Sequence, residues 1–218
     1  MNSVVRSEAW DVRNRLAELG LEEESLRDVV GRGYLAHASC TANHPPLIPA
    51  IWAWGETVRA LREYLLRFGW SRSDENNYSV VVDPAGRVAI AVATGDGGTG
   101  LADVVPSTKS PKGPSTNEAV NVNQLELHLT VEPVAIAAPA KPADRNEARV
   151  VTWILLLHRG ASEVRCELSL PSSMGTGGHI DGWLERILLG SIPLDGDMAE
   201  IVSPSTLPDI SIDVRRRA

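Results

Sequence analysis

The chain has 218 residues, of which 43% are hydrophobic and 22% charged, and its formal net charge is −7 at pH 7. This composition is typical of a globular protein and excludes the disordered class. The negative charge argues against broad nucleic-acid binding, which needs many cationic contacts to phosphates. We expect one domain over residues 1–218, since this length suits a single sizeable core.

Cysteine usage and the N-terminus indicate the compartment. Cys40 and Cys166 lie far apart in the sequence, and the first residues, MNSVVRSEAW, lack the basic and apolar regions of a signal peptide. Reduced thiols are therefore expected rather than a disulfide. The longest apolar run, 153–157, is far too short to span a bilayer. The sequence predicts a soluble, cytoplasmic protein without a membrane segment.

Three helices are predicted in the first 69 residues. Apolar residues recur at helical spacing over 5–19, 22–30 and 49–68. Gly20 and Gly69 are well placed to end the first and the third helix. The third helix has the strongest periodicity, which is typical of a core helix packed across a sheet.

The segment RLAELGLEEESLRDVV resembles a helix-turn-helix in its outline. In that DNA-binding motif the N-terminal residues of the second helix approach the DNA. Here those residues are Glu22, Glu23 and Glu24, which phosphates would repel. We therefore interpret the segment as an ordinary helical hairpin and expect no nucleic-acid partner.

His37, Cys40 and His44 form a weak candidate metal site. All three are zinc-ligand types at spacing i, i+3, i+7. Pro45 and Pro46 follow directly and place His44 at a helix boundary. Because no fourth ligand is nearby, we favour a buried cysteine with two partly exposed histidines and expect no bound metal.

The rest of the chain predicts a mostly antiparallel sheet. A hairpin spans 78–94, with a turn at Asp83–Gly86 and an all-alanine face on its second strand that lets a helix approach closely. Further strands are predicted at 125–131, 148–158, 163–170 and 210–214, long loops at 101–124 and 133–145, and a short helix at 180–189. The predicted fold is thus α+β, with a helical part (1–69), a sheet part (78–218) and a short C-terminal helix.

The glycine-rich stretch GDGGTG, residues 95–100, matches the spacing G-x-G-x-x-G and follows a strand. A dinucleotide site requires a helix to begin there, so that its N-terminus meets the pyrophosphate. Pro106, Pro111 and Pro114 exclude that helix over the next residues. A nucleotide-triphosphate P-loop is excluded as well, because no Lys-Ser/Thr pair follows the last glycine.

A weaker hypothesis survives for the loop 95–113. It is rich in backbone N–H groups outside regular structure and could form a nest for a phosphate or nucleotide. The candidate ligand-binding residues are Thr94, Gly95, Asp96, Gly97, Gly98, Thr99, Gly100, Thr108, Lys109 and Lys112. A second loop, SSMGTGG (172–178), has a similar composition and also follows a predicted strand. If both lie at one edge of the sheet, they frame a single cleft.

The stretches TGDGGTG, PSTKSPKGPST and HIDGWLERILL resemble uncharacterised proteins of bacterial integrative mobile elements. The resemblance covers the C-terminal two-thirds of the chain and implies a setting in a mobile element or defence system, with no activity, cofactor or catalytic residue attached. We expect a non-enzymatic binding or regulatory protein that acts through the loop 95–113 on a protein partner or on itself. The alternative is an enzyme or sensor that binds a nucleotide or phosphate at that loop.

Overall fold

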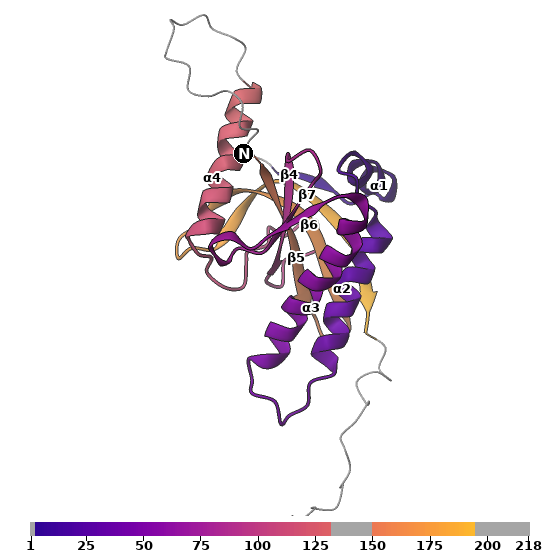
Figure 1. Ribbon diagram of the computed structural model, residues 1–218. Helices are drawn as coiled ribbons and strands as arrows, with labels where there is room; N and C mark the ends of the chain where they lie inside the picture. Colours follow the sequence, from indigo (N-terminus) through magenta and orange to yellow (C-terminus); the bar gives the residue numbers. More distant parts are fainter. Residues whose placement is uncertain (1–2, 132–149, 195–218) are drawn as a thin grey trace, which may run out of the picture.

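A seven-stranded mixed sheet organises the computed structural model, which describes residues 3–131 and 150–194 (Figure 1). The strands are β1 (Val4–Arg6), β2 (Ser71–Ser73), β3 (Val80–Val82), β4 (Val88–Thr94), β5 (Val151–Arg159), β6 (Glu163–Met174) and β7 (Ile180–Pro193), and the α-helices are α1 (Ala9–Glu18), α2 (Glu23–Ala38), α3 (Ile48–Leu65) and α4 (Pro114–Val131). The strand order is β1-β7-β6-β5-β4-β3-β2, and only β1–β7 and β4–β5 pair in parallel. The predicted α+β class, with N-terminal helices followed by a mostly antiparallel sheet, is confirmed.

Helices α1, α2 and α3 cover one face of the sheet (Figure 1). Their apolar sides bury Leu16, Leu26 and Leu61 against Ile90 and Leu155 of the central strands. Close packing of α2 on α3 depends on Gly33, because a Cβ there would lie 2.0 Å from the Thr57 Oγ1. The α2–α3 hairpin can therefore bring its two backbones together only with glycine at this position.

The other face of the sheet carries α4 and the glycine-rich loop. The predicted alanine face of β4 lies here, and Ala89, Ala91 and Ala93 pack with Val120 of α4. The loop leaves β4, crosses the sheet to β7, and returns so that the amide of Lys109 donates to the carbonyl of Thr94 at 2.9 Å. Small residues on β4 leave room for this cover to lie close to the strand.

A buried ion pair holds the glycine-rich loop on the sheet. Glu167 of β6 and Arg186 of β7 are 0% and 1% exposed, and their side chains approach to 2.6 Å. Arg186 also donates to the carbonyls of Leu101 and Val104, while Glu167 accepts from the amide of Gly100 at 2.8 Å. A buried pair needs such extra hydrogen bonds to offset its desolvation, and the loop backbone supplies them.

Asn123 joins α4 to the start of β5 where a proline interrupts the sheet. Two residues beyond the Ile154–Ser169 pair, the β5–β6 register brings Pro171 opposite Thr152. Pro171 has no N–H to donate. The Asn123 side chain donates to the Thr152 carbonyl and accepts from its amide, both at 2.9 Å, so it replaces the missing strand partner.

Several predicted elements agree with the structure in type and place. The helix predicted at 49–68 is α3, the hairpin at 78–94 is β3–β4, and the strands at 148–158 and 163–170 are β5 and β6. The helix predicted at 22–30 continues to Ala38, because Gly31 and Gly33 lie within α2. The helix predicted from residue 5 begins later, at Ala9, since Val4–Arg6 pairs with β7 as β1.

The predicted loop 101–124 and strand 125–131 were wrong over 114–131, which forms α4. Pro114 occupies the first helical position, where a missing N–H costs nothing. Over residues 114–125, the buried positions of the helix are Thr116, Val120 and Asn123, spaced four and three residues apart. Two of these three are polar, so apolar periodicity did not reveal the helix.

The short helix predicted at 180–189 was also wrong, because this segment is strand β7. Trp183 and Ile187 matched helical spacing, yet the strand buries side chains on both faces. The turn before it, 175–178, has Gly177 and Gly178 at φ +83° and +78°, as expected for a tight hairpin connection. Extensive pairing with β6 makes this segment a strand despite its helical spacing of apolar residues.

The predicted loop 133–145 and strand 210–214 lie outside the described residues. Over the two described ranges, no helix is both long and apolar enough to cross a membrane.

We expect the Arg186→Met variant to lose about 3–5 kcal/mol of unfolding free energy, because it leaves the Glu167 carboxylate buried without its cation. The double variant Glu167→Leu with Arg186→Met should recover part of that loss, since no unpaired charge remains. Urea unfolding followed by tryptophan fluorescence measures both. Arg165→Ala is the control, because its partly exposed guanidinium donates to the Gly97 carbonyl and lies 3.9 Å from the Glu163 carboxylate, so its loss should cost about 1 kcal/mol. Equal losses for Arg165→Ala and Arg186→Met would contradict this account.

Gly100→Ala should destabilise the fold by more than about 1 kcal/mol, because Gly100 has φ +74° and a Cβ there would lie 2.9 Å from the Cβ of Arg165. Gly97→Ala is the matched control in the same loop, since its Cβ would meet nothing within 4 Å. Thermal unfolding compares the two variants. A Gly97→Ala loss as large as that of Gly100→Ala would show that the loop does not pack as described.

Candidate functional site

A cleft lies at the carboxyl ends of the parallel strands β4 and β5, under the α2–α3 hairpin. It encloses about 160 Å³ and is lined by Val30, Gly33, Tyr34, His37, Ala50, Ala53, Trp54, Thr57, Thr94, Gly95, Lys109, Leu157, His158, Arg159 and Val164. Carboxyl ends of parallel strands are a common place for ligands in α/β sheets, because side chains and loops from neighbouring strands converge there. We name this feature the strand-end cleft.

The end of β4 is open because β3 stops short of it. The last β3–β4 pair toward this end joins Val80 to Ala91, so the following carbonyls have no partner from β3. The indole of Trp54 donates to the Val92 carbonyl at 3.1 Å, and the Lys109 amide donates to the Thr94 carbonyl. These two bonds fix one wall of the strand-end cleft on the open edge of β4.

The α2 wall depends on how closely α2 approaches α3. Gly33 lies against Thr57, whose hydroxyl donates to the Ala53 carbonyl at 2.7 Å. On the same helix, Tyr34 and His37 line the cleft. The guanidinium carbon of Arg159 lies 6.0 Å from the centre of the Tyr34 ring, which places a cation over an aromatic face.

The strand-end cleft is electropositive. Lys109 and Arg159 line it, as do the imidazoles of His37 and His158, and none of its lining residues is Asp or Glu. In the described part of the chain, no ion pair involves Lys109 or Arg159. Converging cations without a neighbouring carboxylate favour an anionic ligand.

His37 responds to this environment. Burial lowers the pKa of its imidazole, and the nearby positive charge of Arg159 lowers that pKa further. Both effects disfavour the charged form of the ring. The ring is therefore neutral at pH 7 and can gain a proton when a negative charge arrives beside it.

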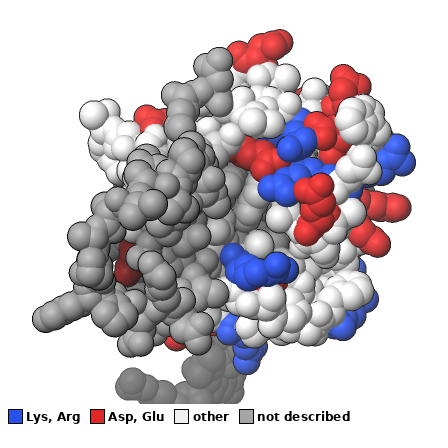
Figure 2. Space-filling model, turned by 90° about the horizontal axis from the view of Figure 1, so that it is seen from above, with Lys and Arg blue, Asp and Glu red and all other residues white. Residues whose placement is uncertain are grey.

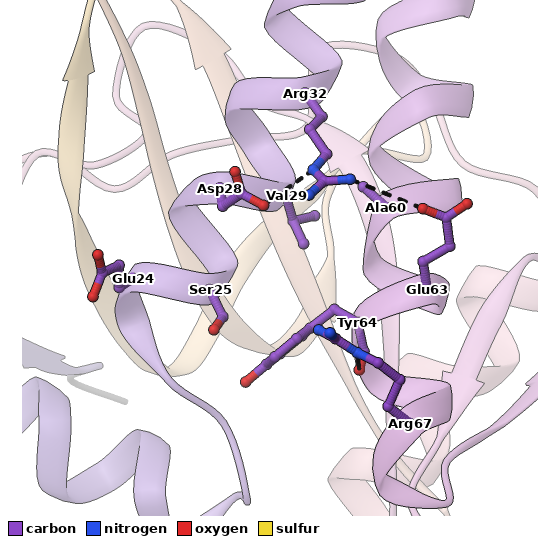
Figure 3. A pocket seen from close by; sticks show the side chains of 9 residues that line it. All are labelled: Glu24, Ser25, Asp28, Val29, Arg32, Ala60, Glu63, Tyr64 and Arg67. Atoms are coloured by element: carbon purple, nitrogen blue, oxygen red, sulfur yellow. Dashed lines mark hydrogen bonds and ion pairs between the residues drawn. The ribbon is translucent and has the colours of Figure 1, made fainter.

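A second pocket, of about 310 Å³, lies farther along α2 and α3 (Figure 3). Its central cation, Arg32, is 3.0 Å from Asp28 and 4.0 Å from Glu63, so local carboxylates already neutralise it. Charges of both signs are likewise interspersed over the part of the face in Figure 2 that is not drawn in grey. This second pocket is less suited to an anion than the strand-end cleft, whose cations lack such partners among the described residues.

The structure brings together only some of the predicted ligand-binding residues. Thr94, Gly95 and Lys109 line the strand-end cleft, and they are joined there by His37, which was predicted only as a weak metal ligand. The other predicted loop residues lie elsewhere: Asp96, Gly97, Gly98, Thr99, Gly100, Thr108 and Lys112 are not among its lining residues. The loop therefore contributes its two ends to the cleft and its middle to the cover of the sheet.

Several amides predicted to form an anion nest donate within the protein. Gly98 donates to the Asp96 side chain at 3.0 Å and Gly100 to Glu167, while Thr99 donates to the Asp96 carbonyl. The amide of Thr108 donates to the Ile180 carbonyl at 3.0 Å. Phosphate binding by the middle of the loop stays a prediction, and it would have to displace these bonds.

The two glycine-containing loops contact each other directly. Lys112 donates its amide to the Gly178 carbonyl at 2.7 Å, and the Thr108 hydroxyl accepts from the Ile180 amide at 3.1 Å. His179 Nδ1 lies 2.6 Å from the Thr108 carbonyl oxygen. The loops touch at these positions, but no residue of 172–178 lines the strand-end cleft, so a single cleft framed by both loops stays a prediction.

The three candidate metal ligands have separate surroundings. His37 lines the strand-end cleft, and Cys40 Sγ lies 3.6 Å from the Ala36 carbonyl. The His44 ring accepts from the Thr41 amide and packs edge-on against Trp52. Within residues 3–131 and 150–194, no group of three or more His, Cys, Asp or Glu side chains could hold a metal ion.

Sequence reasoning missed Tyr34, Trp54, His158 and Arg159 as site residues. A signal existed in the order of the elements, because His158-Arg159 ends one strand and Thr94-Gly95 ends another. Had these strands been recognised as parallel neighbours, both pairs would have been placed at one edge. The α4 crossover that makes them parallel was the element predicted wrongly.

No protein-family model, curated protein or solved structure matches this chain.

Proposed function

We propose that this protein binds a small organic anion in the strand-end cleft and acts as a non-enzymatic binding or regulatory protein. The observation that supports this most directly is the convergence of Lys109, Arg159, His37 and His158 on a cleft without a lining carboxylate. Hydrogen bonds from charged donors to an anion are about twice as strong as neutral ones. The proposal keeps the expected ligand of the glycine-rich loop anionic but moves its site to the loop's two ends.

The size and lining of the cleft restrict the ligand. Its volume of about 160 Å³ is below the roughly 300–1,000 Å³ of pockets that hold drug-sized ligands. Tyr34, Trp54 and Leu157 add aromatic and apolar walls beside the cations. A small carboxylate or phosphate compound with a short apolar or planar body fits this combination better than a whole nucleotide does.

We expect isothermal titration with inorganic phosphate, pyruvate, benzoate and AMP to detect binding of at least one of the small anions and weaker binding of AMP. Lys109→Gln and Arg159→Gln should each lower the affinity by about tenfold to a hundredfold, because each removes a charged donor worth about 1.5–3 kcal/mol.

Lys112→Gln is the matched control, because it removes a cation of the same loop that does not line the cleft. Loss of binding in Lys112→Gln together with unchanged binding in Lys109→Gln would move the site to the middle of the loop. Absence of binding by all four probes would count against the proposed function.

We also expect the affinity for pyruvate, a carboxylate that stays ionised over this range, to increase as the pH falls from about 7 to 5. A bound anion favours protonated His37, so the pKa of this ring is higher in the complex than in the free protein, and binding takes up a proton. Affinity is therefore lost as the pH rises through the pKa of the complex. Titrations at several pH values should show this dependence in the wild type and a flatter one in His37→Gln.

His44→Gln is the control for this pH dependence, because its ring packs against Thr41 and Trp52 away from the cleft. His158→Gln separates the contribution of the second imidazole of the cleft. An affinity independent of pH in the wild type would show that His37 stays neutral in the complex.

A further inference from the structure

The two cations of the strand-end cleft reach it from opposite sides of β4. The Lys109 amide donates to the Thr94 carbonyl on the open edge of β4. Arg159 ends β5, which pairs with the other edge of β4, where Thr94 lies opposite Leu157. Because neighbouring strands are about 4.8 Å apart, the main chain of Lys109 and that of β5 are separated by roughly 10 Å. Each cation therefore enters the cleft from its own side.

The aromatic and imidazole groups of the cleft follow the same division. On the open edge of β4, the Trp54 indole donates to the Val92 carbonyl beside the Lys109 position. On the β5 side, the guanidinium of Arg159 lies over the Tyr34 ring, and its positive charge contributes to the lowered pKa of His37. The cleft thus has one cationic end at the open edge of β4 and another at the end of β5.

The floor between these two ends is neutral. Thr94 and Leu157 are paired across β4 and β5, and with Gly95 they line the cleft. None of the lining residues is Asp or Glu, and within residues 3–131 and 150–194 neither Lys109 nor Arg159 forms an ion pair. Two positive charges therefore face a short neutral floor without a counter-ion from the described part of the chain.

Building on the proposed function, we propose that the ligand of the strand-end cleft is a short dicarboxylate, with one carboxylate at Lys109 and the other at Arg159. A single negative charge compensates one cation and leaves the other unpaired, whereas two carboxylates compensate both. Inorganic phosphate also carries two charges but concentrates them in one compact group. Cations that enter from opposite sides favour two anionic groups on one body.

The same lining restricts the body between the carboxylates. The cleft volume of about 160 Å³ leaves room for only a few carbon atoms there. An ammonium group on that body is disfavoured, because it would face two cations in a cleft without a lining carboxylate. The ligand class is therefore a short dicarboxylate without an amine, which separates succinate from the otherwise similar L-aspartate.

Isothermal titration of the full-length protein with succinate and its monoamide, succinamate, tests this proposal. At about pH 8 both carboxyl groups of succinate are ionised, so the two probes differ by one charge at nearly the same size. We expect succinate to bind at least about tenfold more tightly than succinamate, and more tightly than L-aspartate. Among malonate, succinate, glutarate and adipate, affinity should fall at adipate, the longest.

Lys109→Gln and Arg159→Gln should each reduce the preference for succinate over succinamate to within about threefold, because one of the two carboxylates then lacks its cation. Both side chains belong to exposed residues, so the variants should fold, and circular dichroism checks this. Lys112→Gln is the control, since Lys112 does not line the cleft, and it should keep the wild-type preference.

Three outcomes would overturn the dicarboxylate while leaving small-anion binding in place. They are equal affinity of the wild type for succinate and succinamate, an unchanged preference in both cleft variants, and tighter binding of inorganic phosphate than of any dicarboxylate. Absence of binding by every anion would overturn this inference and count against the proposed function as well.

Discussion

The ion pair between Glu167 and Arg186 is the interaction on which the second face of the sheet depends. Two adjacent strands each place a charged side chain on that face, where a solvated surface would ordinarily be expected. The loop from β4 covers both charges and supplies backbone groups that complete their hydrogen bonds. The glycines therefore allow the loop backbone to approach the two charged side chains closely, and the loop in turn shields these charges from water.

This cover also determines how the strand-end cleft is built. After crossing to β7, the loop must return to the edge of β4 to begin α4, and the return places Lys109 beside Thr94. The cationic Lys109 therefore lies at the open edge of β4, where the Trp54 indole donates to the nearby Val92 carbonyl. The structural role of the loop and the proposed ligand site are thus two parts of one chain path, and they can be separated by substitution at different positions.

The sequence predicted the elements in which apolar residues dominate the buried positions. Helix α3 and strands β4 and β6 have clear periodicity, strand β5 is a near-continuous apolar run, and all four were placed correctly. Helix α4 buries Thr116 and Asn123, and strand β7 buries Arg186, so their inner faces are partly polar. The partners that allow these polar residues to be buried lie far away in the sequence, so a local pattern cannot reveal such an element.

The candidate site was predicted in part for the same reason. Thr94, Gly95 and Lys109 were identified from the composition of the loop, but the reason given for them, a nest of free amides, does not describe the cleft they line. His158 and Arg159 reach the same cleft through the parallel pairing of β4 with β5. That parallel pairing requires α4 to cross the second face of the sheet, and no short sequence motif indicates such a crossover.

The contact of Asn123 with Thr152 gives the sheet an unusual dependence on a helix. In most strands the amide is protected by a neighbouring strand, whatever the surrounding helices do. Here the amide of Thr152 donates to the Asn123 side chain of α4. Pro171 has no N–H, so it cannot donate to the Thr152 carbonyl, which accepts from Asn123 instead. Solvent exchange at this one amide consequently reports the docking of α4, so local opening of the helix can be followed separately from unfolding of the sheet.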